Sequence, residues 1–272
     1  MRSSQVVDGY QEITLNSWNE FVDLSNNEFN RSPAYLYRGQ RRSDWGLISS
    51  LDRLERQFPQ RKNMSGTNPR FFGCPPLSDD EHLQAFRRAI CGRIAENPNK
   101  LSDEECWALG QHYGLATRLL DWTKSPFVAL FFAFEMEYPP HESDSNPTNY
   151  RSVFALSTAA LEEQSGTNSK DAELITTVSE HNRRLISQSG FFVKVPREVD
   201  LVNYVRDRFP GESQRYLMKV NIPDQDRCEC LCMLNKMNIN YASLFPEIEG
   251  AARYVNSMWQ PGLEDITAFL ES

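Results

Sequence analysis

Long hydrophobic runs are scarce in this sequence. The longest apolar run, over residues 127–134, has eight residues, whereas a membrane-spanning helix needs about 20. Residues 1–5 lack the apolar segment of a secretory signal peptide. We therefore expect no membrane span and a cytoplasmic location, where the six cysteines stay free thiols.

Metal-ligand pairs and phosphate-binding loops are also missing. The four histidines are scattered, and Cys228, Cys230 and Cys232 form a single cluster without a second one, whereas structural zinc usually takes two ligand pairs. No Gly-rich phosphate loop and no Gly-x-Ser-x-Gly element occurs. We expect no metal site. A cysteine nucleophile paired with His112 stays open, although no local signature supports it.

Charge is unevenly distributed along the chain. The net charge is −8, yet residues 31–70 hold nine basic and three acidic residues. A basic segment in an acidic protein indicates an anionic ligand on one face. The alternative, a solvated helix face balanced by acidic residues elsewhere, stays open.

Apolar periodicity, caps and breakers predict an α+β chain. Two capping boxes, at Ser78 and Ser102, start helices, and Ser125-Pro126 starts a third, apolar nearly all round, that we expect to be buried at the centre. Further helices are expected within residues 8–30 (from Asn16 or Ser17), 45–58 (Leu47, Leu51 and Leu54 inward), 158–187 (broken near Gly166) and 198–209, and in the tail. Strands are expected at residues 34–40, 116–122, 152–156, 190–195 and 216–222. No linker divides residues 1–272, so we predict one domain with a mainly helical N-terminal portion.

Polar and aromatic side chains are densest over residues 111–126, directly before the apolar run. Upstream, Tyr37-Arg38-Gly39-Gln40 ends a predicted strand, where an arginine can fork onto a phosphate or carboxylate. A structural ion pair between Arg38 and Asp121 is the alternative. Arg118 is equally ambiguous, because one of the charged residues of the 116–122 strand lies near the core and needs a partner.

These residues resemble the FRG domain, named for its Phe/Tyr-Arg-Gly element. The resemblance rests on Tyr37-Arg38-Gly39-Gln40, Trp45, the run from Gln111 to Trp122 (QHYGLATRLLDW), Ser125-Pro126 and Ala129. Asn182-Arg183, the Gln188-x-Gly190-x-Phe192 element and residues 244–250 also fit, so the likeness spans about residues 34–255.

A weaker resemblance, at the level of the fold, connects the chain with ADP-ribosyltransferases. In that family a strand ending in Tyr-Arg-Gly holds NAD, and a Thr-containing strand follows as the second motif. The likeness implies an ADP-ribosyltransferase-like central sheet, mixed or antiparallel. Gln188 stands before a late strand, where those enzymes carry a catalytic glutamate. Glutamine can hydrogen-bond a ribose hydroxyl but cannot act as a base.

Together the resemblances imply an NAD-dependent ADP-ribosyltransferase. They imply Arg38, Asp121 and Gln188 as catalytic residues and Tyr37, Gly39, Gln40, His112, Tyr113, Thr117, Arg118 and Trp122 as cofactor-binding residues. Glu247 and Glu249 are further candidates for the base.

The basic segment indicates a nucleic-acid acceptor, with single-stranded RNA or DNA favoured because exposed bases can stack. Such an activity would harm its own cell, so a toxin or phage-defence role with a neutralising antitoxin partner is expected. The alternatives are a non-catalytic nucleotide or nucleic-acid binding module and a purely structural role for the motif.

Overall fold

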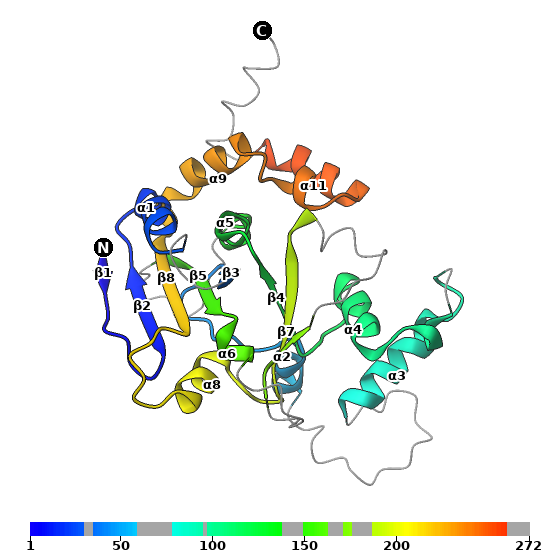
Figure 1. The fold of residues 1–272 in the computed structure, drawn as a ribbon. Coiled ribbons are helices and arrows are strands. Elements are labelled where there is room, and N and C mark those ends of the chain that lie inside the picture. Colours follow the sequence, from blue (N-terminus) through cyan, green and yellow to red (C-terminus); the bar gives the residue numbers. More distant parts are fainter. Residues whose placement is uncertain are drawn as a thin grey trace.

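A mixed sheet and the helices on its two faces make up the described part of the chain (Figure 1). The structure, a computed structural model, describes residues 1–29, 35–58, 78–94, 97–137, 149–162, 171–175 and 187–259. The strands are β1 Arg2–Ser3, β2 Tyr10–Thr14, β3 Tyr35–Gln40, β4 Leu119–Thr123, β5 Tyr150–Ser157, β6 Glu173–Ile175, β7 Gly190–Lys194 and β8 Leu217–Pro223. The helices are α1 Asn19–Asn27, α2 Ser50–Gln57, α3 Asp79–Ile90, α4 Asp103–His112, α5 Pro126–Phe134, α6 Ala159–Glu162, α8 Leu201–Arg208, α9 Arg227–Lys236, α10 Tyr241–Leu244 and α11 Ile248–Ser257. The α+β prediction is confirmed.

The sheet has its weakest junction near the middle. Its strand order is β1-β2-β8-β5-β3-β4-β7-β6, and β2 and β8 run parallel while the other neighbours are antiparallel. Six residue pairs join β3 to β5 and five join β4 to β7. Only Tyr37 and Thr123 pair β3 with β4. The two central strands therefore diverge beyond that pair.

The predicted helix starts are confirmed. Ser78 and Ser102 each form a capping box, so that two otherwise unsatisfied backbone N–H groups at each helix start gain partners. Ser125 caps α5, and Pro126 occupies its first position, where a missing N–H costs nothing. The sequence places these helices because the signals are local.

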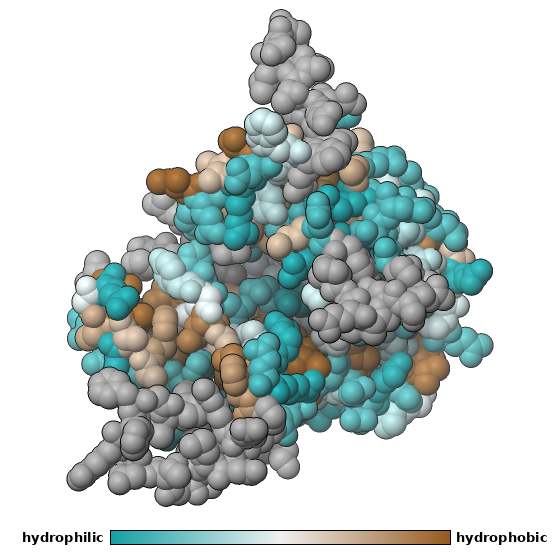
Figure 2. Space-filling model, turned by 180° about the vertical axis from the view of Figure 1, so that it is seen from behind, coloured by the Kyte–Doolittle hydropathy of each residue, from teal (hydrophilic) through white to brown (hydrophobic). Residues whose placement is uncertain are grey.

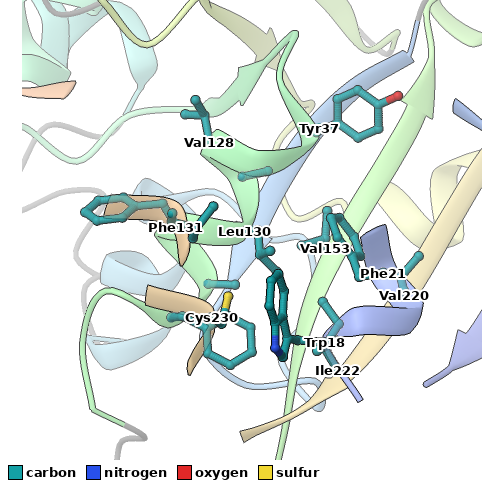
Figure 3. Close-up of a cluster of buried hydrophobic side chains, with 14 of the residues drawn as sticks. Trp18, Phe21, Tyr37, Val128, Leu130, Phe131, Val153, Val220, Ile222 and Cys230 are labelled. Atoms are coloured by element: carbon teal, nitrogen blue, oxygen red, sulfur yellow. The ribbon is translucent and has the colours of Figure 1, made fainter. Parts of the chain in front are cut away.

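Helix α5 lies at the centre of the larger of the two main cores (Figure 3). Trp18, directly before α1, and Phe21 of α1 pack with it, together with Val153 from β5, Val220 from β8 and Cys230 from α9. On the other face of the sheet, α6 and α8 cover Leu36, Phe154 and Leu217 (Figure 1). The predicted buried central helix is confirmed.

Several details differ from the prediction. The chain begins with two strands, β1 and β2, instead of a mainly helical portion. β2 pairs with β8, more than 200 residues away, which no local pattern shows. Residues 173–175, expected to be helical, form β6 on β7; most of the rest of the 158–187 prediction lies outside the described residues. Leu54 is 38% exposed instead of facing inward.

None of the helices in the described ranges has both the length and the apolarity that crossing a bilayer requires. Across the same ranges, His, Cys, Asp and Glu side chains form no cluster that could hold a metal ion. Cys228, Cys230 and Cys232 lie on α9, and Cys230 is buried in the core. Hydrophilic residues predominate on the face opposite to the view of Figure 1 (Figure 2).

Candidate functional site

A cleft of about 730 Å³ opens where β3 and β4 diverge. Its lining includes residues from both faces of the sheet: Leu47 and Trp122 belong to the core under α6 and α8, whereas Tyr37 and Ala129 belong to the core around α5. Helices α2, α4 and α11 each add side chains to its walls. This volume lies in the range of small-molecule and cofactor sites.

Arg38 spans the gap between the two strands. Its Nη1 donates to the main-chain carbonyl of Asp121 at 2.7 Å. A backbone N–H of β3 would bond this carbonyl if the two strands were paired here. Burial lowers the pKa of the Arg38 guanidinium, and the Asp121 carboxylate opposes that shift. That carboxylate is 3.7 Å from Nη1, and the Asp121 side chain is 64% exposed. The two residues therefore do not form the buried ion pair that was the structural alternative.

Two buried donors at the cleft have no partner within the described residues. They are Nε of Arg38 and Nε1 of Trp122. Both side chains are on the same face, because Arg38 follows Tyr37 and Trp122 precedes its partner Thr123 in the antiparallel register. Buried polar groups are nearly always hydrogen-bonded, so the pair favours a ligand rich in acceptor oxygens.

A chain of hydrogen bonds orients Asp121. Its Oδ1 accepts from Nε2 of Gln111 at 2.7 Å, and Oε1 of Gln111 in turn accepts from the hydroxyl of Thr117. Thr117 is fully buried and does not line the cleft. The prediction that it touches the cofactor is therefore replaced by an indirect role: it positions Gln111, which holds the Asp121 carboxylate toward the cleft.

Gln188 converges on the same cleft from the start of β7. Its Nε2 donates to the carbonyl of Leu244 at 3.1 Å, and its own carbonyl accepts from Oγ1 of Thr123 at 2.7 Å. These bonds attach β4, β7 and α10 to one another beside Arg38. Arg38 and Gln188, two of the predicted catalytic residues, therefore line the same cleft, with Trp122 in its wall.

His112 and α11 form another wall. His112 lines the cleft, with its Nε2 3.8 Å from Oε1 of Glu247. Arg253 of α11 also lines the cleft and pairs with Glu249 at 2.6 Å. Glu247 and Glu249 do not line it themselves. Of the three candidate bases, Asp121 is the one that lines the cleft.

Among the described residues, five arginines and three carboxylates line the cleft. Four of the five come from the basic segment of residues 31–70: Arg38, Arg41, Arg53 and Arg56. Arg61 and Lys62 of the same segment lie outside the described residues. Arg42 differs. It is 4% exposed and makes a bidentate pair with Asp44, at 2.9 and 2.7 Å.

Arg118 is not at the cleft, contrary to the prediction. It is 3% exposed and contacts three carboxylates: Asp52 at 2.5 Å, Glu55 at 3.0 Å and Asp79 at 3.0 Å. Burial alone would lower the pKa of Arg118, but the bonds and charges of these acids raise it. Arg118 therefore joins α2, α3 and the start of β4, which is a structural role.

Tyr113 also lies off the cleft. Its side chain is 72% exposed at the end of α4, and it packs edge-on against His112. Tyr113 and Trp122 were both predicted to bind the cofactor, and of these two side chains only Trp122 lies in the cleft wall.

The Tyr37-Arg38-Gly39-Gln40 element combines ligand-facing and structural residues. Tyr37 and Gln40 touch the cleft but are 4% and 8% exposed. Gln40 donates to the carbonyl of Trp45 at 2.7 Å. A Cβ on Gly39 would lie 1.9 Å from the carbonyl oxygen of Ala129. Glycine is therefore required at this position because α5 packs closely against β3, and not only because a ligand could approach the backbone.

Sequence reasoning missed several lining residues. Gln111 belongs to the motif but received no role. Phe245 belongs to the 244–250 segment of the resemblance but was given no role, and Arg253 comes from the tail, where no local signal marks it. Arg53 and Arg56 were visible only as part of the net positive charge of residues 31–70.

Searches among curated proteins and among solved structures found no match to this chain. A family model does match part of it. The matched region holds Arg38, Gln111 and Asp121 and ends before Gln188, so the likeness expected beyond it, including Asn182-Arg183 outside the described residues, is not part of the match. Residues 33–142 match the family model of the FRG domain.

Proposed function

We propose that this chain is an ADP-ribosyltransferase-like enzyme that uses NAD as its substrate and modifies single-stranded RNA or DNA. The observation that carries the proposal is a pair of buried donors, Arg38 Nε and Trp122 Nε1, which have no partner among the described residues and belong to a cleft that also holds Asp121 and Gln188. A dinucleotide offers phosphate and ribose oxygens to such donors. The arginine-rich lining adds charge complementarity for the diphosphate.

Each side chain has a role in this proposal. Arg38 binds the diphosphate or a ribose hydroxyl, and Gln188 hydrogen-bonds the nicotinamide ribose. Gln40 fixes the turn beside Arg38 through its bond to the Trp45 carbonyl. Bound NAD supplies an ADP-ribosyl group whose glycosidic bond breaks through an oxocarbenium-like state, which polar groups stabilise.

Asp121 is the base of the transfer step. As the bond between the ribose anomeric carbon and nicotinamide breaks, a new bond forms from that carbon to the acceptor nucleophile, and Asp121 takes the acceptor proton. Gln111 holds Oδ1 at 2.7 Å, which leaves Oδ2 for the proton. A positioned carboxylate of this kind contributes roughly 10²–10⁴-fold.

A second candidate is a non-catalytic binding module for a nucleotide or nucleic acid. Gln188 favours it, because glutamine stands where the resembling enzymes have a catalytic glutamate. Both readings use the same cleft and differ only in whether the glycosidic bond breaks.

Nicotinamide release separates the two. The protein is incubated with NAD alone and with NAD plus single-stranded RNA or DNA; released nicotinamide is quantified and the strands are analysed by mass spectrometry. We expect release and strands that carry ADP-ribose, with transfer reduced roughly 10²-fold or more in Asp121→Asn. Glu104→Gln, an exposed acid at the start of α4 outside the cleft, is the matched control.

Saturable NAD binding without release would establish the binding module instead. No binding and no release would overturn both. If transfer occurs, we expect the host to hold a neutralising partner protein, as for a toxin.

A further inference from the structure

The turn after β3 presents an aromatic ring at the cleft. Trp45 lines the cleft and is 39% exposed, although most large aromatic side chains of the described residues are buried or half-buried. The Arg41 guanidinium lies over its ring, 5.7 Å from the ring centroid. An exposed tryptophan beside an arginine is the combination on which nucleobases stack.

The turn is held rigidly from several sides. Gln40 donates to the carbonyls of Trp45 at 2.7 Å and Gly46 at 3.3 Å. The Arg42–Asp44 pair and the bond from the Ser43 amide to the Tyr150 carbonyl, at 2.9 Å, fix the residues before Trp45. These bonds hold the backbone on both sides of the exposed ring, so binding a base there costs little ordering of the chain.

Residues after Trp45 are fixed as well. A Cβ on Gly46 would lie 2.1 Å from Oδ2 of Asp200, the residue that caps α8. Leu47 is 1% exposed, and its carbonyl accepts from the Leu201 amide at 3.1 Å. Trp45 is therefore an exposed residue between two anchored segments. Its ring is not needed to hold this turn in place.

Positive charge lies along the same cleft. Arg53 and Arg56 of α2 line it together with Arg41, and both α2 arginines are exposed. Arg53 donates to the Ile48 carbonyl at 2.6 Å, which attaches α2 to the segment that follows Trp45. A ring for a base and arginines for phosphates are what a single strand requires.

We infer that Trp45 and Arg41 form a stacking platform for one base of a single strand, whose phosphates bind Arg53 and Arg56. The inference rests on the proposed nucleic-acid acceptor and deepens it: Trp45 serves the acceptor, whereas Arg38 and Gln188 serve NAD. The platform selects strands with accessible bases, because a paired and stacked base cannot reach the ring.

The test separates base stacking from phosphate binding. Binding of a fluorescently labelled thymidine strand and of an abasic strand of equal length is measured by anisotropy, without NAD. We expect the wild type to prefer the thymidine strand about tenfold, as one stacked base provides. Trp45→Ala should remove that preference, and Trp45→Phe should retain most of it.

Trp259→Ala is the matched control, since Trp259 is 86% exposed but does not line the cleft. It should keep the full preference. Equal binding of both strands by the wild type would overturn the inference, as would a preference that survives Trp45→Ala. Weaker NAD binding in Trp45→Ala with an intact strand preference would also overturn it, because the ring would then serve NAD. Nicotinamide release by the wild type tests the NAD site independently of all these results.

Discussion

Arg38 and Arg118, one from each of the two polar motifs, have opposite surroundings. Arg118 is 3% exposed and contacts the carboxylates of Asp52, Glu55 and Asp79. The Arg38 side chain is 20% exposed, bonds a main-chain carbonyl, and keeps a buried Nε without a partner in the described part of the chain. The charge of Arg118 is fully compensated inside the protein, whereas the charge of Arg38 is only partly compensated.

The difference separates an arginine with a structural role from one that we propose binds a ligand. A guanidinium with three carboxylates has no capacity left for an anion. A guanidinium that spends one donor on a carbonyl and faces an open cleft can still bind one. Both residues stand in polar motifs of the same domain, so their roles follow from their neighbours in space.

The largest effect is expected at Arg118. Arg118→Ala leaves the buried Asp52, whose side chain is 1% exposed, without its cation. Breaking such a pair costs roughly 3–5 kcal/mol, so urea unfolding should show a loss of that size. Arg87→Ala, which removes a pair with the 66% exposed Asp103, is the comparison and should cost less. Equal losses would contradict the special role of Arg118.

Arg38→Ala should affect activity instead. Losing one preorganised donor to a developing charge typically costs about 2.7–4 kcal/mol of transition-state stabilisation, so nicotinamide release should fall roughly 10²–10³-fold. The unfolding free energy should change by about 1 kcal/mol or less, because the lost bond is a single one to a carbonyl. A variant that unfolds outright would show that Arg38 is structural too.

Gly39→Ala tests the packing beside Arg38. The new methyl group meets the Ala129 carbonyl at 1.9 Å and the Ala133 amide nitrogen at 2.6 Å, so α5 must move. Overpacking of this kind costs about 1–3 kcal/mol, measurable by thermal or urea unfolding. An unchanged midpoint would mean that α5 does not approach β3 so closely.

The arginines of α2 should set the salt dependence of strand binding. For single strands the slope of log K against log salt is about −0.7 per phosphate contact, so Arg53→Gln with Arg56→Gln should flatten it by roughly 1.4. Arg88→Gln, exposed on α3 and outside the cleft, should leave it unchanged. A flattening of equal size in both variants would point to non-specific attraction.

The smallest effect is expected at Tyr113. Because its side chain is 72% exposed and off the cleft, Tyr113→Ala should change the unfolding free energy by about 0.5 kcal/mol or less. Nicotinamide release should stay at the wild-type rate. A marked loss of release would restore Tyr113 as a wall of the NAD site.

The local elements and the resemblance to the FRG domain can be predicted from the sequence. Capping boxes at Ser78 and Ser102, the Ser125-Pro126 start of α5 and the strand at Tyr35–Gln40 are visible because their signals lie within a few residues of the element they define. The FRG motif was visible for the same reason, and it placed Arg38 and Asp121 among the residues of interest.

Which motif residues face the cleft depends on contacts between segments that are distant in the sequence. β2 and β6 escaped prediction because their stabilising partners, β8 and β7, are distant in sequence or lie across an unpatterned segment. The cleft itself exists because β3 and β4 share one residue pair and then diverge, a property of two strands that have residues 41–118 between them. That divergence exposes Arg38, brings Arg253 from the tail to the same wall, and leaves Arg118 among carboxylates, where burial and pairing fix its role.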